Sequence, residues 1–188
     1  MNSIIEHKAQ CRLRLKHARA SLSDQQRRQF DQAITAKLLA QAEIHAASSL
    51  FCFISSGTEV ATHELIRTLQ EQGKTIAVPK IINSQQMIAV QLGAWDDLEP
   101  AELGILTPSA SDPVQENIDV CITPGLGFSP SGQRLGFGRG YYDKWFSTNT
   151  VKHKIAICYT CQLLESIPTE KTDCQVDMIV MEDRIIRL

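Results

Sequence analysis

The chain has 188 residues, of which 43% are apolar and 21% are charged. These proportions are typical of a globular protein of one domain, and they exclude global disorder and a fibrous repeat. Nineteen lysines and arginines are balanced by 21 aspartates and glutamates, and the net charge of -2 excludes a general basic surface for nucleic acid. No apolar segment is long enough for a membrane span or an export signal, so we expect a cytoplasmic protein.

Two helices are predicted before any strand. Residues 4–20 favour the first helix, and its basic residues recur every three or four positions, which predicts one basic face: Lys8, Arg12, Lys16 and Arg19. Ordinarily such a face is simply solvated. Ser23 followed by Gln26 has the pattern of a capping box, which predicts a second helix that ends near Ala42.

A strand, a helix and a second strand are predicted next. Residues 49–54 form an apolar run typical of a strand covered on both faces, a helix over 61–72 ends before Gly73, and residues 75–78 form a strand that Pro79 ends. Because two parallel strands need a crossover element, this order indicates an α/β fold.

The rest of the chain continues the α/β pattern. We expect strands at 87–92, 118–122 and 154–158, a surface loop at 104–113, a short helix at 141–146, and a final hairpin of residues 176–181 and 184–188. The expected fold is α/β, a single domain over residues 1–188 with a largely parallel central sheet and helices on both faces.

Six cysteines are present, and Cys52 and Cys121 lie inside apolar runs, as small buried residues do. Cys158 and Cys161 form a CxxC pair that would suit a redox or zinc site. The first of them closes a predicted strand, and no second pair exists, so packing is the favoured interpretation.

The segment from Pro124 to Asp143 holds six of the ten glycines. Glycines let a backbone approach a ligand closely, and consecutive N–H groups before a helix can surround a phosphate group. Neither the P-loop pattern nor the dinucleotide fingerprint occurs in the chain. A tight surface turn would not need this many glycines, nor Arg134 and Arg139 beside them, so we expect an anion-binding loop.

In this segment, Arg134-Leu135-Gly136-x-Gly138-x-Gly140 followed by Tyr141-Tyr142-Asp143 resembles the signature of the 5-formyltetrahydrofolate cyclo-ligase family, also called 5,10-methenyltetrahydrofolate synthetases. The resemblance spans nearly the whole chain through further segments in the family's order: Pro124-Gly125, Lys8-x-x-x-Arg12, Glu59-Val60-x-Thr62, Gln162, Pro168, Asp173 and Asp177. The chain departs from the family at Gly127-Phe128-Ser129, where Ala-Phe-Asp is common, and at Thr107-Pro108, where Glu-Pro is common.

The resemblance implies a sugar-phosphate isomerase or CoA-transferase type of fold and an ATP- and Mg²⁺-dependent ring closure of 5-formyltetrahydrofolate. Phosphate transfer to the formyl oxygen would give an imidate phosphate, which the folate N10 attacks as phosphate departs. The implied catalytic residues are Arg134 and Tyr142. The implied ATP-binding residues are Lys8, Arg12, Arg134, Leu135, Gly136, Phe137, Gly138, Arg139, Gly140, Tyr141 and Tyr142.

For the folate substrate, the resemblance implies contacts with Glu59, Gly138, Arg139, Gly140 and Tyr141. For the metal, it implies Asp143 and Asp177, because Mg²⁺ prefers carboxylate, phosphate and water oxygens. No nucleic acid, membrane or obligate protein partner is expected. Two alternatives stay open: a non-catalytic nucleotide- or phosphate-binding regulator on the same scaffold, and a thiol or zinc protein that uses Cys158 and Cys161, with or without Cys174.

Overall fold

The computed structural model describes residues 2–100, 106–114, 117–170 and 172–188. Across these ranges, one sheet has seven strands in the order β11-β10-β9-β6-β1-β2-β3. Their bounds are Ser49–Cys52 (β1), Thr75–Ile81 (β2), Met87–Gln91 (β3), Ile118–Thr123 (β6), Val151–Ile157 (β9), Met178–Val180 (β10) and Ile185–Arg187 (β11). The five central strands are parallel, and β3 and β11 are antiparallel edges. The predicted α/β fold with a largely parallel sheet is confirmed.

The helices are α1 (Asn2–Ala20), α2 (Asp24–Leu39), α3 (Ala42–Ala46), α4 (His63–Glu71) and α5 (Tyr141–Thr148), with short 3-10 turns η1 (Trp95–Asp97) and η3 (Thr160–Gln162). The predicted capping box of Ser23 and Gln26 begins α2. Our predicted end of this helix near Ala42 was wrong, because Gln41 adopts an extended backbone and separates α2 from α3. Gly73, at φ 78°, follows α4 as a C-terminal cap.

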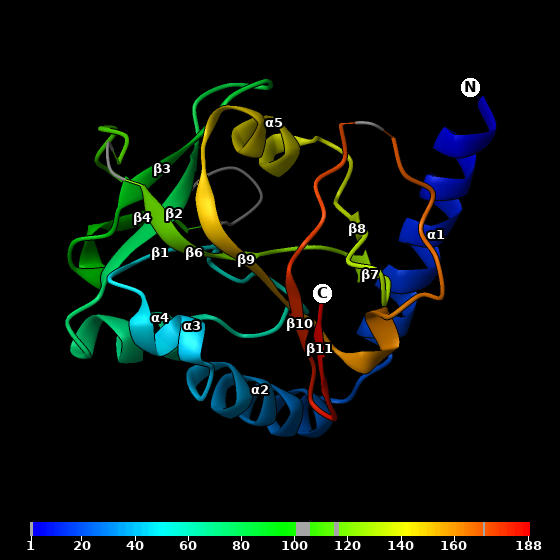
Figure 1. Cartoon of the computed structure of the whole chain (residues 1–188), viewed down its shortest axis with the longest axis horizontal. Helices are drawn as coiled ribbons and strands as arrows, with labels where there is room; N and C mark the ends of the chain where they lie inside the picture. Colours follow the sequence, from blue (N-terminus) through cyan, green and yellow to red (C-terminus); the bar gives the residue numbers. More distant parts are fainter. Residues whose placement is uncertain (1, 101–105, 115–116, 171) are drawn as a thin grey trace.

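The two faces of the sheet carry different cores because side chains alternate along each strand. Leu50, Val120 and Ile155 point to the face covered by α2, α3 and α4. Phe51 and Cys121 point to the opposite face, where they pack with Trp145 of α5. Figure 1 shows α2, α3 and α4 below the sheet and α5 above it. The predicted placement of helices on both faces is confirmed.

β2 continues through Pro79 to Ile81, so the prediction that Pro79 ends this strand was wrong. β2 pairs with β1 only as far as Ala77, and beyond that residue its partner is β3. A proline has no N–H to donate, and strands accept it where one side has no neighbouring strand. Pro79 lies where β2 has become such an edge.

The predicted surface loop at 104–113 is partly a strand. Residues Leu106–Pro108 form β5, which pairs with β4 (Leu98–Pro100) in a small antiparallel sheet. Lys80 Nζ donates to the carbonyl oxygens of Pro108 (2.9 Å), Ser109 (2.8 Å) and Ala110 (2.8 Å), which ties this sheet to β2. The part of the prediction at 104–105 lies outside the described residues.

The order of the strands places a switch point between β1 and β6. The chain leaves β1 toward β2 on one side, whereas it leaves β6 toward β9 on the other side. Ligands of open α/β sheets bind in the crevice outside the carboxyl ends of the strands at such a point. Here the segment after β1 carries Glu59, and the segment after β6 is the glycine-rich segment.

α1 lies at one end of the sheet, beside the segment between η3 and β10 (Figure 1). Its apolar contacts are made by Cys11 and Leu15, which pack with Leu126, Leu135 and Leu164. Among the described helices, none combines the length and the apolar composition needed to cross a membrane.

We predict that Leu15→Ala destabilises the protein by about 2–5 kcal/mol, because it removes a buried side chain from the contact between α1 and the rest of the fold. Leu15 is 1% exposed, whereas Leu13 of the same helix is 71% exposed. Leu13→Ala is therefore the matched control and should change the free energy of unfolding by less than about 0.5 kcal/mol. Urea unfolding of both variants measures the difference, and equal losses would contradict the packing of α1 described here.

Candidate active site

The inner face of α1 carries cations as well as apolar residues. Lys8 and Arg19 are each 7% exposed, and Arg12 is partly buried, whereas Lys16 is exposed. The predicted shared face of four basic residues was therefore wrong for Lys16. A helix turns about 100° per residue, which places Arg12 and Arg19 within about 40° of Lys8 but Lys16 about 80° away.

Lys8 is held by two acidic residues from the segment before β10. Its Nζ donates to Glu170 Oε2 at 2.8 Å and to Asp173 Oδ2 at 2.7 Å. Burial by itself lowers the pKa of Lys8, but the hydrogen bonds and charges of Asp173 and Glu170 outweigh it, so the pKa is raised. Lys8 is therefore a fixed cation on the inner face of α1.

The glycine-rich segment begins as a hairpin and ends as an open loop. β7 (Gly127–Phe128) pairs with β8 (Arg134–Leu135) in an antiparallel ladder. Residues 136–140 then lead into α5, and Gly138 and Gly140 have φ of 110° and 67°, which favours glycine. Phe137 and Arg139 alternate with these glycines and are exposed, so their side chains leave the backbone of the loop accessible.

Arg12 and Arg134 converge on this loop from two elements. Arg12 Nε donates to Gly136 O at 2.9 Å, and its Cζ would lie 3.5 Å from a Cβ at Gly138. Arg134 Nη1 would lie 3.0 Å from a Cβ at Gly136, so a side chain there would crowd the guanidinium. The loop and both cations thus form one concentration of N–H donors and positive charge, as an anionic ligand requires.

Arg134 also connects β8 to α5. Its side chain is 4% exposed and forms an ion pair with Asp143 in the first turn of α5, and Nη1 donates to Pro124 O at 3.3 Å. Asp143 Oδ1 additionally accepts from the Cys174 N–H at 3.1 Å. Among the described residues, Arg134 Nε has no partner, which leaves one buried donor beside the loop.

The two tyrosines of the motif have different surroundings. Tyr142 stacks on Phe51 with ring centroids 5.6 Å apart, and its hydroxyl is buried with no partner in the described part of the chain. Burial raises the pKa of Tyr142 well above 10, so its hydroxyl stays a donor. Tyr141 is partly exposed and donates to Asn83 O at 3.3 Å, so it faces the turn between β2 and β3. Leu135, in contrast, is buried in the α1 core and has no side-chain surface for a ligand.

Glu59 lies in the turn that follows β1. Thr62 fixes this turn, because its Oγ1 donates to Phe53 O at 2.8 Å and accepts from Ser55 N at 2.9 Å. The Glu59 carboxylate accepts from Ser56 N at 2.9 Å and lines a pocket of about 310 Å³. Burial raises the pKa of Glu59, and the Ser56 hydrogen bond and the charge of Arg19 lower it in part.

The two predicted metal ligands have different partners. Asp177 is exposed, and its Oδ2 accepts from the backbone N–H of Lys154 at 2.7 Å. Asp143 instead contacts Arg134 and Cys174. In the described ranges, no group of three His, Cys, Asp or Glu side chains would hold a metal ion alone. Asp143 still fits Mg²⁺, because a carboxylate has further acceptor sites and Mg²⁺ takes one or two carboxylates together with phosphates and water.

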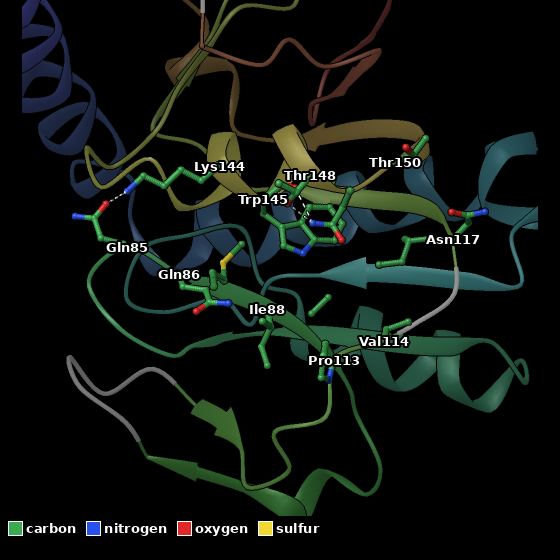
Figure 2. Close-up of a pocket in the computed structure, with 14 residues that line it drawn as sticks. Gln85, Gln86, Ile88, Pro113, Val114, Asn117, Lys144, Trp145, Thr148 and Thr150 are labelled. Carbon is green, nitrogen blue, oxygen red and sulfur yellow. Dashed lines mark hydrogen bonds between the residues drawn. The ribbon is translucent and has the colours of Figure 1, made fainter.

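A larger cavity of about 480 Å³ lies between α5, β3 and the residues that precede β6. Figure 2 shows Trp145 and Ile88 beside it, with the amides of Gln86 and Asn117 and the ammonium of Lys144 around it. Trp145 is 6% exposed and packs against Phe51, so it presents little of its ring to this cavity. None of the residues that the sequence motif singles out lines this cavity.

Cys158 and Cys161 follow β9 at the carboxyl edge of the sheet. Burial raises the pKa of both thiols, that of Cys158 well above 9, which disfavours the thiolate that redox chemistry and zinc binding need. Cys158 packs with Phe128 and Ile179. The preferred interpretation of this pair as packing residues is thus supported.

Gln162 is named by the sequence resemblance without a role, and the structure shows what it holds. Its Nε2 donates to Gly125 O at 3.2 Å and to Leu126 O at 3.1 Å, and its Oε1 accepts from Tyr159 N at 3.1 Å. It therefore joins the end of β9 to the start of the glycine-rich segment. Lys144 and Trp145, in contrast, were missed, since only the fold brings α5 over β3.

Comparison with known proteins is consistent with this geometry. A family model described as the 5-formyltetrahydrofolate cyclo-ligase family matches residues 4–182. A Caenorhabditis elegans protein named probable 5-formyltetrahydrofolate cyclo-ligase is 28% identical and is matched over 99% of this chain and 98% of its own. A mouse 5-formyltetrahydrofolate cyclo-ligase is 29% identical over 92% of each chain.

Solved structures agree on the fold. The NMR structure of Aquifex aeolicus 5,10-methenyltetrahydrofolate synthetase superposes with a TM-score of 0.85 at 26% identity, over 96% of this chain and 92% of that chain. A synthetase of Mycoplasma pneumoniae, at 23% identity and a TM-score of 0.73 over 93% of this chain and 98% of that chain, has the same fold. With a family match over nearly all of its length, the chain belongs to the 5-formyltetrahydrofolate cyclo-ligase family.

Proposed function

We propose that this chain closes the ring of 5-formyltetrahydrofolate to give 5,10-methenyltetrahydrofolate, with ATP and Mg²⁺, and releases ADP and phosphate. The observation that carries the proposal is the convergence of Arg12 and Arg134 on the open loop 136–140, at the switch point of the sheet. One domain, residues 1–188, would hold the whole site. A cytoplasmic location is part of the proposal.

Phosphate transfer accounts for the concentration of cations. The formyl oxygen is a poor leaving group and must first be activated by phosphorylation. It attacks the γ-phosphorus of ATP, and ADP departs. The charge of the transferred group must be neutralised and its position held, which N–H donors and cations do. Arg134 has a free Nε among the described residues, and Lys8 uses two of its three ammonium protons on carboxylates.

Ring closure follows on the imidate phosphate. The folate N10 attacks the activated carbon, the phosphate leaves with the carbon–oxygen bonding pair, and N10 loses its proton. Glu59 would accept hydrogen bonds from the N–H groups of the pterin ring, and Tyr142 would donate its buried hydroxyl to the substrate oxygen. The accessible backbone of Gly138 and Gly140, together with Arg139 and Tyr141, would contact both substrates.

Magnesium would bind the ATP phosphates and Asp143, with Asp177 as a second ligand, and would supply positive charge to the β- and γ-phosphates. The family match and the structural neighbours support the folate activity. The use of ATP and Mg²⁺, and the imidate phosphate, are proposals based on the residues described above. A regulator that only binds a nucleotide is the alternative, which the following experiment separates.

We predict that the purified protein, given 5-formyltetrahydrofolate, ATP and magnesium, shows an ATP-dependent rise in near-ultraviolet absorbance, because the methenyl product has a conjugated amidinium group. Arg134→Ala should lower kcat/KM by about 100-fold or more, because it removes a cation placed for the transferred phosphate. Arg14→Ala is the control, since Arg14 is an exposed residue of α1.

Arg134→Ala also leaves Asp143 without its ion pair, so circular dichroism accompanies the assay. Arg134→Lys keeps a cation and should recover part of the loss if charge is what the reaction needs. If folded wild-type protein binds ATP but its near-ultraviolet absorbance does not rise, the enzymatic function is overturned and the regulator is favoured.

We predict that Asp143→Asn raises the magnesium concentration for half-maximal rate by about tenfold, because the amide keeps the shape of the side chain but loses the charge. A magnesium titration of the initial rate measures this change. Asp177→Asn should act in the same direction, while Asp96→Asn, an exposed residue of η1, should not. An unchanged requirement in either of the first two variants would remove that residue from the metal site.

A further inference from the structure

Arg19 is a buried arginine that neither the family motif nor the proposed mechanism uses. It lies in the last turn of α1, two turns beyond Arg12 on the inner face, and is 7% exposed. Burying a guanidinium costs free energy unless oxygens or charges compensate it. Burial lowers the pKa of Arg19, and the carboxylate of Glu59 raises it in part.

The contacts of Arg19 reach both loops of the candidate site. Its Nε donates to Thr58 Oγ1 at 2.9 Å, in the turn that carries Glu59. Its Cζ lies 5.9 Å from the centroid of the Phe137 ring, in the loop between Gly136 and Gly140. Across the described residues, the Thr58 contact is the one hydrogen bond that the guanidinium makes. One side chain of α1 therefore touches the turn after β1 and the loop after β8.

The charged groups around Glu59 show why the position of Arg19 matters for the carboxylate. Acidic and basic side chains from α2, together with His63 of α4, line the same pocket: Asp24, Arg27, Arg28 and Asp31. Tyr142 of α5 interacts with Glu59 electrostatically. Arg27 is already paired with Asp24. Arg19 is the cation whose charge stabilises the ionised form of Glu59.

We infer that Arg19 is a positioning residue of the folate site: it holds the Glu59 turn through Thr58, brings a positive charge next to that turn, and connects the turn to Phe137 in the loop 136–140. This inference rests on the proposed function, in which Glu59 accepts hydrogen bonds from the pterin. A protonated Glu59 would lose acceptor capacity and bind the pterin less well.

The pH dependence follows from the sign of the charge effect. Removal of the Arg19 cation raises the pKa of Glu59 further above its usual value, since burial then acts with less compensation. The carboxylate that binds folate is then lost at a higher pH as the solution is acidified. Activity that depends on Glu59 should therefore fall earlier on the acid side.

The test compares Arg19→Gln, which keeps a hydrogen-bond donor but loses the charge, with Arg19→Lys, which keeps the charge. At saturating ATP, Arg19→Gln should raise the KM for 5-formyltetrahydrofolate about tenfold and shift the acid limb of kcat/KM upward by about one pH unit. Arg19→Lys should keep the acid limb of the wild type. Lys16→Gln, one turn earlier and exposed, should match the wild type in both measurements.

The inference is overturned if the acid limb of Arg19→Gln is unshifted, or if the acid limb of Arg19→Lys differs from that of the wild type. In either case, turnover by the wild type still supports the proposed function. If the wild type shows no turnover, the proposed function fails, and calorimetric binding of 5-formyltetrahydrofolate to the same variants decides the role of Arg19 separately. Should Arg19→Gln not fold, Thr58→Val removes only the acceptor and should raise KM without a shift of the acid limb; an unchanged KM overturns the inference.

Discussion

β1 and β6 pair in parallel at the centre of the sheet, Leu50 beside Val120, although a helix, two strands and a small second sheet lie between them in the chain. This pairing makes two distant segments leave the sheet at one edge. These segments are the turn that carries Glu59 and the glycine-rich segment. The pairing also places Phe51 beside Cys121, which forms the apolar surface on which Tyr142 and Trp145 pack. The position of α5, and with it Asp143, depends on that surface.

The second constraint is the burial of positive charge. Lys8, Arg19 and Arg134 are less than one-tenth exposed, and a core built for stability alone would hold apolar side chains there. Each cation is compensated by an oxygen from another segment: Glu170 and Asp173 for Lys8, Thr58 for Arg19, and Asp143 for Arg134. Cations concentrated in this way suit an anionic ligand, which supplies further compensation when it binds.

The sequence predicted most of the fold because its signals are local. Ser23 and Gln26 form their capping box within four residues, and Gly73 ends α4. Predictions failed where a neighbouring strand decides the outcome: Pro79 lies within β2 because β1 has already ended beside it. The strand β5 likewise exists through its pairing with β4 and the bonds of Lys80, which no local pattern in 104–113 indicates.

In the candidate site, too, the features with local sequence signals were predictable, and those that depend on tertiary packing were not. The glycines and Arg134 are adjacent in the sequence, so the loop was recognisable from its motif. The role of Arg19 was not, although its angular position on α1 close to Arg12 was a readable signal. The larger cavity beside Trp145 depends on the packing of α5 over β3, which only the tertiary structure shows.

The ion pairs of Lys8 join α1 to Glu170 and Asp173, which lie 162 and 165 positions later in the chain. During synthesis, α1 leaves the ribosome long before Glu170 and Asp173 are made, so Lys8 lacks both of its acidic partners for most of that time. Lys8 is therefore an uncompensated cation in the nascent chain, whereas Arg19 can already find Thr58. The cation cluster of the candidate site can therefore be completed only after the segment before β10 has been synthesised.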